Sequence, residues 1–259
     1  MQTIIQNIHG YTVQATDGDV GKVDTLYVDD ETWAIRYLVI NVGNWFMTDK
    51  ILLSPMAVTE VNTDDETISV ALTKEQVKES PDVDTEKPVS RQYETTLHDY
   101  YNWRPYWLDA PTYAGGLTAV RTPTTLNYKP RPENRMVTPA DDADPYLRST
   151  REMVGYHIHA TDGEIGHIET FLVDTDLWFV RYFVVDTRNW LPGKKVIVAP
   201  NWINTIHWAD NDVTVGLAKE AIKSSPEFEG PIAINRDYEQ RLYDHYHRSV
   251  YWQEMEPTR

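Results

Sequence analysis

Three histidines in one stretch have the residue type and spacing that could bind a transition metal. His157 and His159 are two residues apart, so on a β-strand they point to the same face, and His167 can lie on the adjacent strand of that hairpin. Imidazole nitrogens are ligands of zinc and nickel. We nevertheless expect no bound metal, because the chain has no cysteine to complete such a site and because a similar, earlier stretch carries only polar residues at these positions: Thr12, Gln14 and Lys22.

Carboxylates gather in two kinds of turn. Asp17 and Asp162 each precede a glycine, where an aspartate usually forms the hydrogen bonds of an Asx turn. Residues 29–31 (Asp-Asp-Glu) and residues 174–176 (Asp-Thr-Asp) are richer in acids. A calcium loop such as the EF-hand supplies more oxygen ligands in one segment. We therefore expect both acidic turns to be solvated loop tips.

Arg36 and Arg181 occupy matching places among apolar neighbours, where a guanidinium could bind a carboxylate of a partner or ligand. The alternative is an internal ion pair with an acid such as Asp29 or Glu31 or their counterparts, and the excess of acids over bases favours it. Four tryptophans could likewise form an aromatic slot for a ligand, but aromatic residues at matching sites more often cap a core. These are Trp33, Trp45, Trp178 and Trp190.

The sequence lacks the common catalytic motifs. It has no G-x-S-x-G elbow, no glycine-rich phosphate loop and no H-E-x-x-H helix, and the absence of cysteine excludes disulfides and thiol catalysis. The sequence therefore predicts a protein that is not an enzyme and that needs no cofactor.

Charge and hydropathy restrict the partners and the location. The net charge of -16 and the pI near 4.8 repel phosphate backbones, so we do not expect nucleic acid to bind. The mean hydropathy is -0.52, and no apolar run approaches the roughly 18 residues of a membrane span. The first residues lack the pattern of a signal peptide. We expect a cytoplasmic protein without a transmembrane segment.

The chain contains an internal repeat with an offset of 145 residues. Aligned without a gap, residues 10–107 (the first copy) and residues 155–252 (the second copy) are identical at 34 of 98 positions. A repeat of this extent indicates a tandem duplication. It predicts two lobes of the same topology, with the boundary inside residues 108–153.

Each copy begins with short segments of strand character. Alternating apolar residues, separated by turns such as Asp-Gly, predict six short strands, which fit a small, partly closed β-barrel better than a βαβ sheet. In the first copy the segments are 11–15, 21–29, 33–42, 51–53, 58–61 and 67–72. The predicted fold class is therefore mainly β with helical appendices, in two tandem small β-barrels.

A helical appendix follows each barrel. Residues 73–81 predict a short helix that is stopped by proline, and a second helix starts at Ser90 or at Asn235. Its stripe of Tyr93, Leu97 and Tyr101 should pack on barrel surface, since so small a barrel buries little surface alone. Residues 108–153 are rich in proline and predict an extended connector. The predicted domains are thus residues 1–107, the connector 108–153, and residues 154–259.

The ordered set of motifs in both copies resembles the PRC-barrel family. The motifs are ATDGDVGKV or ATDGEIGHI, DDETW or DTDLW, RYLVI or RYFVV, and an N-W pair. This family includes the cytoplasmic part of the photosynthetic reaction centre H subunit and the C-terminal domain of the ribosome maturation factor RimM. The appendix also looks like that of bacterial tandem PRC-barrel proteins. The resemblance implies docking onto larger assemblies rather than catalysis.

We therefore predict a protein-binding or scaffolding module that self-associates, for example as a homodimer, or docks a protein partner. Two alternatives stay open: a protein that binds a metal or small ligand on the histidine face, and an electron-transport accessory that resembles the H subunit. Exposed aromatic and arginine residues are the predicted partner-binding groups. They are Tyr106, Trp107, Tyr251, Trp252, Arg36 and Arg181.

Overall fold

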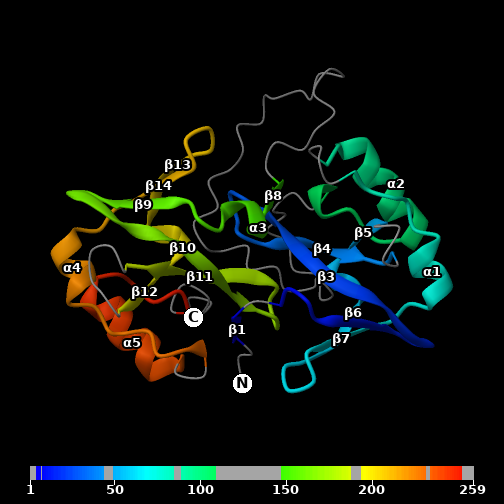
Figure 1. Cartoon of the computed structure of the whole chain (residues 1–259), viewed down its shortest axis with the longest axis horizontal. Coiled ribbons are helices and arrows are strands. Elements are labelled where there is room, and N and C mark those ends of the chain that lie inside the picture. Colours follow the sequence, from blue (N-terminus) through cyan, green and yellow to red (C-terminus); the bar gives the residue numbers. More distant parts are fainter. Residues whose placement is uncertain are drawn as a thin grey trace, which may run out of the picture. The chain divides into compact units, whose positions relative to one another are not determined.

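The computed structural model describes residues 4–6, 8–43, 49–84, 89–108, 147–187, 194–231 and 234–252. Two of the four tryptophans singled out above, Trp45 and Trp190, lie outside these residues, as does the connector up to residue 146. The chain divides into two compact units. The first lobe holds the first copy, and the second lobe holds the second copy (Figure 1).

The first lobe is built on one curved sheet with the order β5-β4-β3-β2-β7-β6. Neighbouring strands pair antiparallel, except that β2 and β7 are parallel. The strands are β2 (Thr12–Ala15), β3 (Gly18–Asp29), β4 (Ile35–Asn41), β5 (Lys50–Leu53), β6 (Val58–Asn62) and β7 (Thr67–Val70). The helical elements are η1 (Pro55–Ala57), α1 (Lys74–Lys78), α2 (Arg91–Tyr101) and η2 (Tyr106–Leu108).

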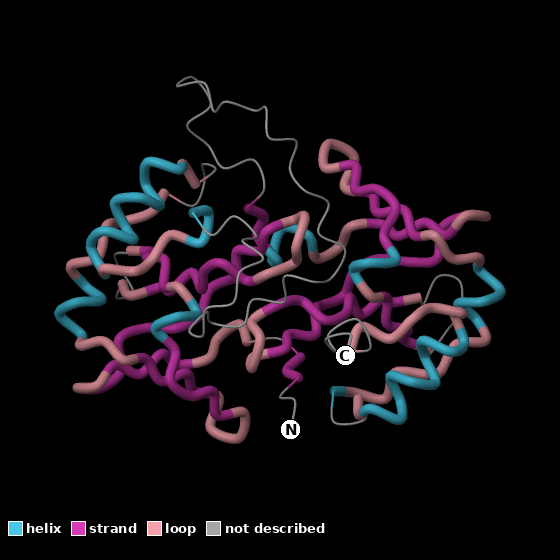
Figure 2. The backbone as a smooth tube through the Cα atoms, turned by 180° about the vertical axis from the view of Figure 1, so that it is seen from behind, coloured by secondary structure: helices cyan, strands magenta, loops and turns pink. Residues whose placement is uncertain are grey.

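The second lobe repeats this plan in the order β12-β11-β10-β9-β14-β13. Its strands are β9 (His157–Ala160), β10 (Gly163–Asp174), β11 (Phe179–Asp186), β12 (Lys195–Val198), β13 (Ile203–His207) and β14 (Asp212–Val215). The helical elements are α3 (Thr150–Met153), η3 (Pro200–Trp202), α4 (Lys219–Lys223) and α5 (Arg236–His245). Figure 2 shows both strands and helices in each copy, and α1 and α2, or α4 and α5, follow the strands along the chain.

Registers in the two sheets agree after the offset of 145. Tyr27 faces Tyr37 across β3 and β4, and Leu172 faces Tyr182 across β10 and β11. The mainly β fold class and the repetition of one topology are therefore confirmed.

In the part of the chain that the structure describes, the sheets do not close into complete barrels, which agrees with the predicted partly closed barrel. Within the described residues each hydrogen-bonded path is open, from β5 to β6 and from β12 to β13. The outer edge of β5 is instead used by the segment after α1, because the Val83 amide donates to the carbonyl of Lys50 at 3.0 Å. Phe228 does the same to Lys195 on β12, at 3.2 Å.

Close packing of two strands explains a glycine in each copy. A Cβ on Gly21 would come within 2.3 Å of the carbonyl oxygen of Asn41, and one on Gly166 within 2.0 Å of the carbonyl oxygen of Asp186. These distances are far below van der Waals contact, so only glycine lets β3 and β4, or β10 and β11, approach there.

The predicted packing of the helical stripe is confirmed for the first lobe. Leu97 is fully buried in a core cluster that α2 forms with β3, β4 and β5, and Tyr93 and Tyr101 pack against it. Ser90 caps α2 by accepting a hydrogen bond from the amide of Tyr93. Burial of this stripe joins the appendix to the sheet.

The aspartates of the Asp-Gly turns contact a distant segment. Asp17 Oδ1 accepts a hydrogen bond from the amide of Lys74 at 2.7 Å, and Asp162 Oδ1 accepts one from Lys219 at 2.8 Å. The expected local Asx turn is thus corrected to a bond that ties the turn to the first residue of α1 or α4, where a negative charge is favourable.

Two further strands were not predicted. β1 (Ile4–Gln6) pairs antiparallel with β10, in the sheet of the second lobe. β8 (Leu147–Ser149) pairs antiparallel with β3, in the sheet of the first lobe. The predicted connector is therefore corrected at its end, since its last seven residues form β8 and α3.

No helix among the described residues is both long and apolar enough to cross a membrane.

Candidate functional site

Each acidic turn provides a buried aspartate that pairs with the arginine of the next strand. Arg36 Nη2 donates to Asp29 Oδ2 at 3.1 Å, and Arg181 makes the equivalent bond to Asp174. This result confirms the internal ion pair as the role of both arginines. It corrects the expectation of a solvated tip for the first acid of each turn, because Asp29 is 8% and Asp174 0% exposed.

The same aspartates hold the turns closed. Asp29 Oδ1 accepts hydrogen bonds from the amides of Glu31 and Thr32, and Asp174 Oδ1 accepts the equivalent pair. Each turn ends at a tryptophan with positive φ, 60° at Trp33 and 52° at Trp178. Such a conformation is costly for a bulky residue, so the aspartate network stabilises it.

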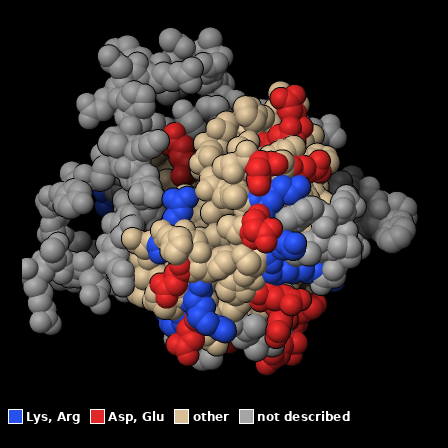
Figure 3. Space-filling model, turned by 90° about the vertical axis from the view of Figure 1, so that its left-hand side faces the viewer, with Lys and Arg blue, Asp and Glu red and all other residues tan. Residues whose placement is uncertain are grey.

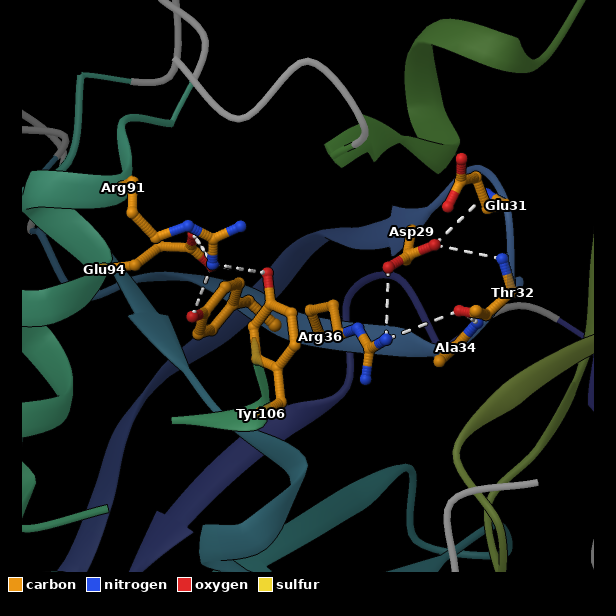
Figure 4. A network of polar contacts seen from close by, with 9 residues as sticks. Asp29, Glu31, Thr32, Ala34, Arg36, Arg91, Glu94 and Tyr106 are labelled. Carbon is orange, nitrogen blue, oxygen red and sulfur yellow. Dashed lines mark hydrogen bonds and ion pairs between the residues drawn. The ribbon is translucent and has the colours of Figure 1, made fainter. Parts of the chain in front are cut away.

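Tyr106 joins the ion pair to helix α2. The guanidinium carbon of Arg36 lies 4.2 Å from the centre of the Tyr106 ring, and the Tyr106 hydroxyl donates to Glu94 Oε1 at 2.8 Å. Figure 4 shows Tyr106 between Arg36 and the Arg91–Glu94 pair. Glu94 is fully buried and also accepts a bond from the Tyr37 hydroxyl at 2.8 Å. It therefore links β4, α2 and the segment after α2.

The second lobe contains the same network with deeper burial. Glu239 accepts hydrogen bonds from the hydroxyls of Tyr182 and Tyr251, at 2.8 and 3.2 Å. The Arg181 guanidinium lies between two rings, 3.7 Å from the centre of Tyr251 and 4.1 Å from that of Phe179. Among the described residues its Nε and Nη1 atoms have no hydrogen-bond partner. The aromatic faces therefore take the place of hydrogen bonds around this cation.

A tryptophan follows each of these tyrosines and stacks on a second arginine. The Arg91 guanidinium lies 4.3 Å from the centre of a Trp107 ring, and Arg236 lies 4.2 Å from Trp252. Both tryptophans are partly exposed, whereas Tyr251 is only 1% exposed. The expectation of exposed aromatic residues is therefore wrong for Tyr251, whose hydroxyl reaches the buried Glu239, whereas Tyr106 is partly exposed like the two tryptophans. We name each stacked arginine and tryptophan a cluster: the Arg91–Trp107 cluster and the Arg236–Trp252 cluster.

Burial and neighbouring charge set the protonation of the network. Burial would raise the pKa of Asp29, but the charge of Arg36 and the hydrogen bonds from Thr32 outweigh it and hold that pKa below its ordinary value. Burial, together with the charge of Glu94, raises the pKa of Tyr37 well above 10. Asp29 thus stays the anionic partner of Arg36, and Tyr37 keeps the hydroxyl proton that it donates to Glu94.

His98 is the main difference between the two networks, because the second copy has Tyr243 at this position. His98 is 2% exposed, and its Nε2 lies 3.0 Å from the Tyr37 hydroxyl oxygen. Since the single hydroxyl proton of Tyr37 goes to Glu94, His98 donates through Nε2. Its ring also meets that of Trp107 edge-on at 4.9 Å.

This difference predicts acid sensitivity of the first lobe alone. Burial lowers the pKa of His98 below 6.5, an effect that backbone hydrogen bonding at Trp103 and Arg104 opposes and the charge of Arg91 reinforces. The unfolded chain therefore takes up a proton near pH 6.5 while the folded chain does so only at lower pH, and stability is lost as the pH falls below 6.5. We expect His98→Tyr to remove this part of the pH dependence of the melting temperature between pH 7.5 and 5. Tyr243→His should introduce it in the second lobe, and a parent and His98→Tyr variant with parallel pH profiles would contradict the assignment.

The three candidate metal ligands lie on one hairpin. His157 on β9 faces His167 on β10, as predicted. His157 Nδ1 contacts Glu164 at 3.0 Å, and His159 Nε2 contacts Asp212 at 3.4 Å. No group of three or more histidines, aspartates or glutamates among the described residues is arranged to hold a metal ion. The absence of a metal stays a prediction.

Charged side chains are mixed on the face seen in Figure 3, where basic groups lie among acidic ones. That face offers no continuous basic surface of the kind that binds a phosphate backbone.

The sequence identified the arginines and the Tyr-Trp pairs as candidate binding residues, but it did not predict that they contact one another. It missed Glu94 and Glu239, which organise both networks. The spacing of Arg91 and Glu94, three residues apart on a helix and repeated at Arg236 and Glu239, is the signal that could have found them.

The comparisons with known proteins give one family. The family model described as PRC-barrel domain matches residues 4–77. The search of curated proteins found no match.

Proposed function

We propose that this chain, whose residues 4–77 are a PRC-barrel domain, is a non-enzymatic module that docks protein partners or scaffolds an assembly. The observation that carries the proposal is the partly exposed tryptophan that stacks on an arginine at the same place in both copies. The Arg91–Trp107 cluster and the Arg236–Trp252 cluster are the proposed contact residues.

The chemistry of these clusters suits a protein interface. Tryptophan and arginine are the residues most enriched among those that dominate binding energy. The networks described above hold both side chains in place, so little conformational freedom remains to be lost on binding. The arginine side chains keep 27% and 49% of their surface exposed while they pair with Glu94 and Glu239, so each can also contact a carboxylate of the partner.

The remaining features agree with a binding role. The buried carboxylates of Glu94 and Glu239 are engaged by two tyrosines and an arginine each, so their contacts are those of structural groups. The excess of acids, 40 against 24 bases, disfavours nucleic acid and favours solubility. We propose a cytoplasmic protein, as the sequence predicts.

A pull-down with the immobilised chain, together with light scattering, tests the proposal directly. We expect Trp107→Ala/Trp252→Ala to lose the protein that the parent chain captures from a lysate, or to lose self-association measured by light scattering after size exclusion. Met56→Ala is the matched control, because Met56 is an apolar side chain that is 47% exposed elsewhere in the first lobe. Equal melting temperatures of the variants establish that folding is retained.

Two outcomes would overturn the proposal. One is that the double variant captures the same proteins and has the same mass in solution as the parent. The other is that Met56→Ala abolishes binding while the double variant retains it.

A further inference from the structure

The short strand that precedes each copy pairs in the sheet of the other lobe: β1 precedes the first copy, and β8 precedes the second. We call this arrangement the exchange. The slot that receives a strand is the end of β3 in the first lobe, where β8 faces residues 27–29, and the end of β10 in the second lobe, where β1 faces residues 172–174. These slots are equivalent at the offset of 145. The family match begins at residue 4, so the PRC-barrel sequence includes β1, although β1 pairs in the other lobe.

Pairing within one copy is within reach of the chain. Thr12 on β2 faces Lys22, and β2 lies on the same edge of β3 as the slot. Residues 7–11 would have to pass only residues 23–26 to bring Gln6 opposite Tyr27. The exchange is therefore not forced by chain length.

A turn directs the strand away from its own sheet. The amide of Tyr11 donates to the carbonyl of Ile8 at 3.3 Å, and Gly10 has φ of +87°. This left-handed residue matches the third position of a type II turn. The second copy repeats it, with Tyr156 bonded to Met153 at 3.2 Å and Gly155 at +93°. The turn leaves each slot open for another strand.

We propose that the ion pair between Arg148 and Asp30 decides which strand enters which slot. Arg148 on β8 places its Nε 3.0 Å from Asp30 Oδ2. At the equivalent places the second lobe has Thr175 beside its slot, and β1 has Ile5 opposite Val173. Only the strand that carries arginine thus supplies a cation to Asp30, whereas the second lobe has a threonine and no carboxylate at that place.

If the wrong strand occupied the first slot, the carboxylate of Asp30 would be destabilised. Its side chain is 10% exposed and stands between Asp29 and Glu31. Burial raises the pKa of Asp30 to about 6 even though Arg148 lowers it. Isoleucine in the slot would remove that cation and leave a buried carboxylate among acids, which disfavours the pairing of a copy with its own strand.

Other contacts show that β8 fits the first lobe. The hydroxyl oxygens of Ser149 and Thr25 are 3.0 Å apart, and Leu147 packs against the core cluster of Tyr27, Tyr37 and Leu97. The strand therefore adds to the core as well as to the sheet. It follows that each sheet is completed by the strand that precedes the other copy.

Introduced cysteines can report which strand occupies which slot, because the chain has no cysteine of its own. Thr25→Cys/Ser149→Cys replaces two oxygens at 3.0 Å by sulfurs that bond at about 2.05 Å. Oxidation should give a disulfide within one chain, seen by intact mass and by mobility on a non-reducing gel. Ser149→Cys/Thr170→Cys is the matched control, since residue 170 is the second-copy equivalent of residue 25. It should stay reduced.

Moving the arginine tests the selection. In Ile5→Arg/Arg148→Ile the arginine lies on the first copy's own strand, and we expect the cross-link to move from the 25/149 pair to the 149/170 pair. Asp30→Thr/Arg148→Ile makes the slots alike, and both cross-links should form. An exclusive 25/149 cross-link in both variants would overturn the selection by charge. A 149/170 cross-link in the parent chain, or a covalent dimer, would overturn the exchange itself.

Discussion

Arg181→Ala is expected to lower the free energy of unfolding by about 3–5 kcal/mol, the usual range when one partner of a buried ion pair is removed. Arg181 is 2% and Asp174 0% exposed, so the variant leaves a charged carboxylate in the interior without its cation. It also removes the group that lies between the rings of Phe179 and Tyr251. Urea unfolding followed by circular dichroism measures the loss.

The first copy supplies the matched control. The side chains of Arg36 and Asp29 are 14% and 12% exposed, so water screens and solvates their charges better, and Arg36→Ala should cost about 1–2 kcal/mol. Equal losses in the two variants would show that burial does not set the strength of this pair.

Glu239→Ala is expected to destabilise the second lobe by about 2–6 kcal/mol, because it removes the acceptor of two buried hydroxyl groups, each of which costs about 1–3 kcal/mol when unsatisfied. The hydroxyls are those of Tyr182 and Tyr251. Without this link α5 and the segment after it lose their polar attachment to the sheet. Protection of the α5 amides from hydrogen exchange should fall, and the urea midpoint should fall with it.

Glu239→Gln separates the hydrogen bonds from the charge. It keeps an acceptor oxygen for the tyrosines and gives up the ion pair with Arg236, so its loss should be well below that of Glu239→Ala. Glu94→Ala should reproduce the large effect in the first lobe, through Tyr37 and Tyr106. A Glu239→Ala chain as stable as the parent would contradict the role of the glutamate as the link.

Periodicity and turn residues predicted the strands and helices of each copy, because both report local preferences. The alternation of 67–72, for example, appears as β7, whose residues alternate between partly exposed and buried. The pairing of Arg36 with an aspartate of the preceding turn was also predictable, since the two residues are close in sequence.

Long-range contacts account for what the sequence did not reveal. Glu94 lies 57 residues from Tyr37, and Ser149 lies 124 residues from Thr25, so neither contact leaves a local pattern. β1 and β8 are three residues each, too short for an alternation to be recognised. The burial of Tyr251 was not predicted, because the acceptor of its hydroxyl group, Glu239, lies in a different segment of the chain.

Hydroxyl-radical footprinting of the full chain, alone and with the protein that it captures, tests the proposed docking face most directly. The account predicts that Trp107 and Trp252 are protected from oxidation in the complex, while Met56 is oxidised as in the free chain. Protection of Met56 with unchanged oxidation of both tryptophans would contradict it.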